Sequence, residues 1–153
     1  MKRLLIPCLL ISGLFLATAV VSLAVAGAGA LPAELTEGDI TSFFGASDQV
    51  MTPYDVQLDG RVIISSIARD GGGPEIIWQR TYGLSSATSR FGDIGDPAIL
   101  PVGFEVRDNE NVITAEVFYD FEPIMMTGVL DPTQLYSRAV FRPRFGTLTT
   151  VKP

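Results

Sequence analysis

Arg61-Val62-Ile63-Ile64-Ser65-Ser66-Ile67-Ala68 is a run rich in β-branched residues, and a second run, Pro74-Glu75-Ile76-Ile77-Trp78-Gln79-Arg80-Thr81-Tyr82, follows it closely. Between them lies Asp70-Gly71-Gly72-Gly73, whose composition is typical of a tight connection. Two such runs around a glycine-rich loop predict a β-hairpin. We therefore expect the folded domain to be built on a β-sheet that includes this hairpin.

Further strands are expected towards the C-terminus. Val112–Phe121 alternates between apolar and polar residues, Leu135–Arg142 is a similar run ended by Pro143, and Val102–Val106 is compatible with a shorter strand. With the hairpin, these runs predict four or five strands in a meander-like antiparallel sheet. The turn-rich segment before them, 83–101, includes one stretch compatible with a short helical turn, around Ser86–Phe91.

The alternation within Val112–Phe121 assigns its side chains to two faces. One face carries Ile113, Ala115, Val117, Tyr119 and Phe121, and the other carries Thr114, Glu116, Asp120 and Glu122, with Phe118 as an exception. This pattern predicts a half-buried antiparallel strand whose acidic side faces away from the core.

A short helix is expected before the sheet. Thr36 and Asp39 have the spacing of a capping box, and Ile40, Phe43 and Phe44 follow at helical spacing. These signals predict a helix over about residues 38–50. Met51–Asp55, which contains Pro53, is expected to be a turn or an extended linker.

The chain starts with Met1-Lys2-Arg3 and then a run without a single charge, Leu4–Leu31. As a helix this run would extend over about 42 Å, and a bilayer core needs only about 20 apolar residues. Gly13 and Ala17 are spaced for close contact between helices. We expect a transmembrane anchor whose N-terminus is cytoplasmic, because the basic residues precede it.

The small residues Ala26-Gly27-Ala28-Gly29-Ala30 leave a second interpretation open, since they resemble the cleavage region of a signal peptide. In either case the sequence divides into three parts. Residues 1–31 are an anchor or signal-like segment, 32–57 a short helix and linker, and 58–153 an antiparallel β domain. The expected fold class is α+β.

Composition excludes several classes of function. After residue 31 the chain carries 17 acidic residues and, without Lys2 and Arg3, 9 basic ones, a net charge of −8. This balance argues against binding nucleic acid, whose phosphates require lysine and arginine. The chain has no histidine and one cysteine, Cys8, which excludes an intramolecular disulfide, a Ser-His-Asp triad and metal sites built on histidine or several cysteines.

Acidic residues are the remaining candidates for chemistry. Asp93 and Asp96, together with Asp70 and Glu75, are compatible with a Ca²⁺ loop, but such sites need six to eight oxygens, so a structural turn is the preferred interpretation. Glu116, Asp120 and Glu122 form an acidic stripe along one strand face. Residues four apart on a strand lie about 13 Å apart, which excludes Glu116 and Asp120 as a glycosidase pair.

We instead expect this acidic stripe to be solvated, or paired across the sheet with Arg138 and Arg142. Trp78 is expected in the core, with an interface anchor as the alternative. Gly71-Gly72-Gly73 is not followed by a phosphate-loop Lys-Ser/Thr and is assigned to a turn. We therefore predict no catalytic, cofactor-binding or metal-binding residues.

Three stretches, taken in order, resemble the TadE-like family of minor pilin-like proteins of the tight-adherence pilus assembly system. They are Val62–Ile67 with Ile77-Trp78-Gln79-Arg80, then Asn111-Val112-Ile113-Thr114-Ala115-Glu116-Val117-Phe118-Tyr119-Asp120-Phe121-Glu122-Pro123, and then Leu135-Tyr136-Ser137-Arg138-Ala139-Val140-Phe141-Arg142-Pro143-Arg144. Met51-Thr52-Pro53-Tyr54-Asp55 is similar to a segment placed before the first strand in such proteins. The resemblance covers about residues 51–144.

The resemblance implies a pilin-like fold and a non-enzymatic pilus assembly component. Its partners would be the lipid bilayer and other pilin or assembly subunits, with a single-pass location in the bacterial inner membrane and a periplasmic domain. The family's apolar helix typically starts with a glycine and, five residues on, a glutamate, whereas Leu4–Leu31 contains no glutamate. Two alternatives remain, a periplasmic or secreted binding module released by signal cleavage and an enzyme that uses carboxylates alone.

Overall fold

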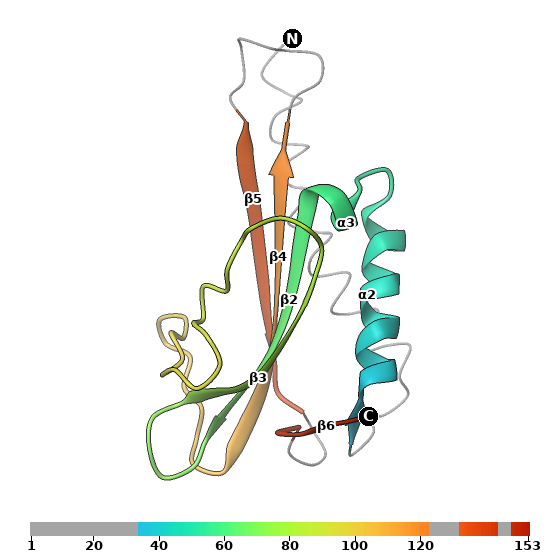
Figure 1. The fold of residues 1–153 in the computed structure, drawn as a ribbon. Coiled ribbons are helices and arrows are strands. Elements are labelled where there is room, and N and C mark those ends of the chain that lie inside the picture. Colours follow the sequence, from blue (N-terminus) through green and yellow to red (C-terminus); the bar gives the residue numbers. More distant parts are fainter. Residues whose placement is uncertain (1–33, 123–131, 144–147) are drawn as a thin grey trace.

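The protein is an α+β fold in which one long helix lies against a four-stranded antiparallel sheet (Figure 1). The computed structural model describes residues 34–122, 132–143 and 148–153. The sheet strands are long, and two short strands form a separate pair. In chain order the elements are β1 (Leu35–Thr36), α2 (Glu37–Met51), α3 (Val56–Asp59), β2 (Gly60–Arg69), β3 (Glu75–Tyr82), β4 (Glu110–Phe121), β5 (Thr133–Phe141) and β6 (Val151–Lys152).

The sheet has the strand order β3-β2-β4-β5, and every neighbouring pair is antiparallel. The predicted hairpin is confirmed as β2 and β3, and the two later strands are confirmed as β4 and β5. The meander-like order was wrong, because β4 pairs with β2 instead of β3. The chain reaches β4 by residues 83–109, hereafter the crossover segment, which runs across one face of the sheet (Figure 1).

Two local expectations for the crossover segment were also wrong. Residues 86–91 form no helical turn, and 102–106 form no strand. The segment is held by scattered bonds instead, such as the bond from the Ile99 amide to the Phe91 carbonyl and the turn from Phe104 back to Pro101. An irregular chain of this kind satisfies its backbone groups locally, without the ladder that a strand requires.

The helix α2 starts where the sequence predicts. Thr36 Oγ1 accepts a hydrogen bond from the Asp39 amide, and Asp39 Oδ2 accepts one from the Thr36 amide, so the capping box is complete. The carboxylate of Glu37, in the first turn, bonds the guanidinium of Arg80 on β3. These contacts fix the start of the helix to the sheet.

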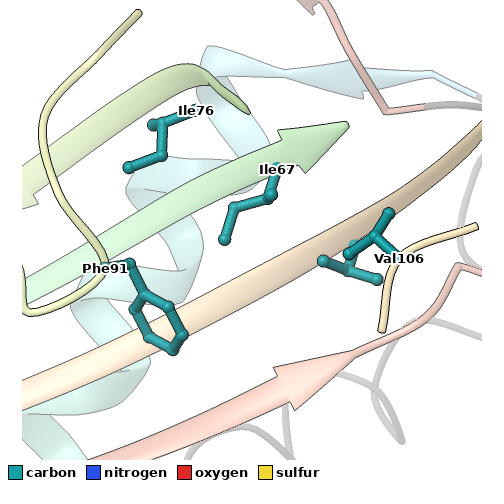
Figure 2. Packing of buried hydrophobic residues seen from close by; sticks show 5 residues of the cluster. Ile67, Ile76, Phe91 and Val106 are labelled. Atoms are coloured by element: carbon teal, nitrogen blue, oxygen red, sulfur yellow. The ribbon is translucent and has the colours of Figure 1, made fainter. Parts of the chain in front are cut away.

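The central strands, β2 and β4, are buried on both faces of the sheet, and α2 covers one of these two faces. On this helix face, α2 packs against Ile64, Trp78 and Ile113, and further along against Val62 and Val117. On the opposite face, the crossover segment inserts Phe91 and Val106 against Ile67, Ile76 and Val112. Figure 2 shows these side chains from close by, with Phe91 and Val106 on either side of Ile67.

This double cover overturns the half-buried interpretation of Val112–Phe121. The face assigned to solvent carries Thr114 and Glu116, both 0% exposed, and Phe118, which is 2% exposed. The predicted alternation of side chains is confirmed, but a polar residue on an alternating strand is solvated only where no other segment covers that face.

The C-terminal tail also belongs to the core. Leu148 is buried, and its carbonyl accepts hydrogen bonds from Trp78 Nε1 and Ser66 Oγ, while its amide donates to Asn111 Oδ1. Three residues later, β6 pairs in parallel with β1, directly before α2. No sequence pattern predicts this pair, because two residues are too few for a periodic signal.

The expected membrane anchor, residues 1–31, lies outside the described residues. Within residues 34–122, 132–143 and 148–153, no helix has the length and apolar character needed to cross a membrane.

Two glycine substitutions with opposite expected effects test this description. Gly45 lies in α2, is exposed, and has no atom within 4 Å of an added Cβ. Gly45→Ala is expected to raise the free energy of unfolding by about 0.5–1 kcal/mol, because alanine loses less backbone entropy.

Gly83 is the matched contrast, with φ +99° and an added Cβ that would lie 2.3 Å from the Gly60 carbonyl oxygen. Gly83→Ala is expected to lower stability by more than about 1 kcal/mol. Urea unfolding of the full chain in detergent, followed by fluorescence of the sole tryptophan, Trp78, measures both. Equal effects of the two variants would contradict the backbone assignments.

Candidate functional site

Glu116 is a buried carboxylate at the centre of the sheet. It is 0% exposed, and both oxygens accept hydrogen bonds: Oε2 from the Ser89 hydroxyl, and Oε1 from the Arg90 amide at 3.0 Å and the Tyr136 hydroxyl at 2.8 Å. Ser89 and Arg90 belong to the crossover segment, and Tyr136 to β5. The carboxylate therefore joins three parts of the chain, and its oxygens are occupied by donors rather than exposed to a substrate.

Glu116 is not paired with arginine as the sequence interpretation proposed. Arg138 is its partner in the β4–β5 register, yet the Arg138 guanidinium lies 5.9 Å from the centre of the Phe91 ring. Arg142 pairs with Glu110 at 3.4 Å and donates to the Glu105 carbonyl at 2.6 Å. The buried charge is instead stabilised by hydroxyl and amide donors, which is the other way to offset its desolvation.

Tyr136 is held between this carboxylate and an arginine. Arg90 lies over its ring at 3.8 Å from the centre, and Phe118 packs against it at 4.9 Å. Burial and the hydrogen bond to Glu116 raise the pKa of Tyr136 to about 12. At neutral pH the hydroxyl is therefore protonated and available as a donor.

The other two acidic residues of the stripe lie at its exposed end. Asp120 accepts hydrogen bonds from the Ser85 hydroxyl and from Gln134 Nε2 at 2.9 Å, and these two bonds lower the pKa of its carboxyl. Glu122 is exposed, just beyond β4. The prediction that the stripe is solvated is therefore confirmed for Glu122 and wrong for Glu116. For Asp120 it did not include the hydrogen bond to Ser85 of the crossover segment.

Asp93 and Asp96, the residues considered for a Ca²⁺ loop, lie in a turn. The Asp96 amide bonds the Asp93 carbonyl, and the Asp96 carbonyl accepts from Ile76 at the start of β3. Asp70 lies in the hairpin loop, where Gly71 has a φ of +67°. Among the residues that the structure describes, no group of three or more acidic, histidine or cysteine side chains is placed to hold a metal.

The Trp78 prediction is confirmed, since its side chain is 6% exposed and packs with Ile40 and Ile64. Its indole N–H donates to the Leu148 carbonyl at 3.0 Å. The core interpretation therefore holds, and Trp78 also anchors the C-terminal tail.

Sequence reasoning missed a cationic surface beside β5, made by Arg90, Tyr136 and Arg138. Both arginines are exposed, and neither forms an ion pair within the described residues. Arg90 comes from the irregular crossover segment, so no strand pattern placed it next to Tyr136. The sequence shows only that basic residues are scarce after residue 31. It does not show that two of them lie on the same surface.

Comparisons with known proteins found no matching family model, no similar curated protein and no similar solved structure.

Removing the buried carboxylate is expected to destabilise the fold strongly. Glu116→Ala leaves the Ser89 hydroxyl, the Arg90 amide and the Tyr136 hydroxyl without their acceptor, which should cost about 3 kcal/mol or more. Urea unfolding monitored at Trp78 measures the change. Glu122→Ala, an acidic residue near the end of the same strand, should change stability by no more than about 0.5 kcal/mol. Similar costs for both variants would contradict the structural role of Glu116.

Stability should fall in strong base. The pKa of Tyr136 and that of Tyr82, which donates to Asp48, are both raised to about 12, from an ordinary value of 10. A raised folded-state pKa gives stability that is complete below pH 10 and is lost as the pH rises through about 12. Urea midpoints between pH 8 and 12 should therefore decline above pH 10. The decline should be shallower in Tyr136→Phe, and an unchanged slope in that variant would refute the assignment.

Proposed function

We propose that the protein is a non-enzymatic, minor pilin-like or assembly component of a tight-adherence pilus system. Its apolar segment, residues 4–31, would be retained in the bacterial inner membrane and pack among the helices of other pilin or assembly subunits. The described domain would lie on the periplasmic side and contact partner subunits.

The observation that supports the proposal most directly is the short connection between the apolar run and the folded domain. Five residues separate Leu31 from Glu37, the first residue of α2. The start of α2 is fixed by its capping box, by the Glu37–Arg80 ion pair and by the pairing of β1 with β6. A short link to a fixed helix would limit how the domain is oriented relative to an anchor, as an assembling subunit requires.

The location of the family-like stretches adds support. The first is the β2–β3 hairpin, the second is β4, and the third includes β5. Glu116 of the second stretch and Tyr136 of the third bond each other, and the first stretch pairs with the second through β2 and β4. A helix packed against an antiparallel sheet is also the arrangement that a pilin-like fold implies.

The decisive experiment is deletion of the gene in the bacterium that encodes it, with pili counted by electron microscopy. Piliation should be lost and should return when the full chain is supplied. Leu14→Arg is expected to fail to restore it, because a charge near the middle of an anchor costs about 2.5–3.5 kcal/mol. Leu14→Ala is the control and should restore pili.

Two results would overturn the proposal. Normal piliation after deletion would remove the assembly role. A mature N-terminus near Leu31, read by mass spectrometry on protein that washes off membranes, would show instead a released module.

A further inference from the structure

From Gln134 to Phe141, strand β5 presents a regular open edge. Its nine residues pair with β4 in an unbroken register from Phe141 to Thr133, without an internal proline or a register shift. Within the described residues, no strand pairs with the other side of β5. Natural sheets usually protect such edges with prolines, bulges or a covering loop, because an unprotected edge pairs readily with another chain.

The opposite edge strand, β3, is covered at its start by a loop. The crossover segment bonds the start of β3, with the Ala98 amide donating to the Pro74 carbonyl and the Gly95 amide to the Ile76 carbonyl. The β2–β3 ladder also carries a register shift between Ser66 and Ile67. The two edges therefore differ: β3 is bonded at its start and its ladder is shifted, whereas β5 pairs evenly along its length.

Positive charge is concentrated beside this edge. The exposed guanidinium groups of Arg90 and Arg138 lie on the crossover face, one over Tyr136 and the other near Phe91, and neither has an ion-pair partner in the described part of the chain. The chain after residue 31 has a net charge of −8. A cationic surface on an acidic domain favours a partner that places carboxylates next to its arginines.

The other face of β5 carries three apolar residues, besides Thr133 and Ser137. Leu135, Ala139 and Phe141 point to the helix side and are half-buried, and none belongs to the clusters that pack around α2. A strand added beside β5 would alternate its side chains between these two environments. It would place acidic side chains near Arg90 and Arg138 and apolar ones near Leu135 and Ala139.

We propose that β5 binds an extended acidic segment of a partner protein as a fifth strand of the sheet, with carboxylates next to Arg90 and Arg138. The sequence of β5, Thr-Gln-Leu-Tyr-Ser-Arg-Ala-Val-Phe, contains no acidic residue, so the same edge of a second copy offers Arg138 no counter-charge. This inference goes beyond the proposed function and does not depend on it, since strand addition requires no pilus.

The test uses the full chain in detergent and a fluorescein-labelled peptide in which glutamate and valine alternate over about eight residues. Fluorescence anisotropy measures its binding. The same peptide with glutamine in place of glutamate should bind more weakly, and one with alternate backbone nitrogens methylated should not bind, because its ladder bonds are removed.

The matched variants are Arg138→Gln and Arg107→Gln, the latter an exposed arginine in the turn before β4. Arg138→Gln should weaken binding of the glutamate peptide about two- to fivefold and leave the glutamine peptide unaffected, whereas Arg107→Gln should change neither. Equal binding of the glutamate and glutamine peptides would overturn the proposal, as would undiminished binding of the methylated one. So would dimerisation of the chain, seen by sedimentation, that Arg138→Gln abolishes without any peptide binding.

Discussion

The fold depends on burying the strand β4 on both faces. Its residues on the helix side meet α2, and those on the other side meet the crossover segment, which is irregular along its whole length. A strand in the middle of a small antiparallel sheet commonly leaves one face in water. Here that face is closed by a segment that has no ladder of its own, so its position must be fixed by side-chain contacts.

Glu116 makes the polar contacts that hold the crossover segment, and Phe91 and Val106 make the apolar ones. An ionised carboxylate is costly to bury unless every oxygen is bonded, and this one accepts from Ser89, Arg90 and Tyr136. Two of these donors belong to the crossover segment. The cost of burying the charge is therefore offset only when that segment lies in its observed place, which makes the contact specific as well as stabilising.

The sequence predicted the regular elements well, because each has a local signal. β-Branched runs around Gly71 marked the hairpin, alternation marked β4 and β5, and the Thr36–Asp39 spacing marked the start of α2. The strand order was not predictable, since the pairing of β4 with β2 depends on where an irregular segment crosses the sheet. For the same reason the sequence predicts Glu116 to be solvated or paired with arginine, although its alternation with apolar neighbours is evident.

The candidate sites also divide into those with a local sequence signal and those without one. The turn at Asp93–Asp96 and the core position of Trp78 were predictable from residue type, whereas the arginine surface beside β5 combines a strand residue with Arg90 from the crossover segment. The short β1–β6 pair lacked a pattern, yet it helps to fix the start of α2, on which the proposed orientation of the domain depends.

The buried carboxylate of Glu116 holds the crossover segment on the sheet. Hydrogen exchange of the Arg90 amide in the full chain tests this contact most directly, because this N–H donates to Glu116 Oε1 at 3.0 Å. We predict that it exchanges as slowly as the amides of β4. Exchange as fast as that of the exposed Val102 amide, with β4 still protected, would contradict the account.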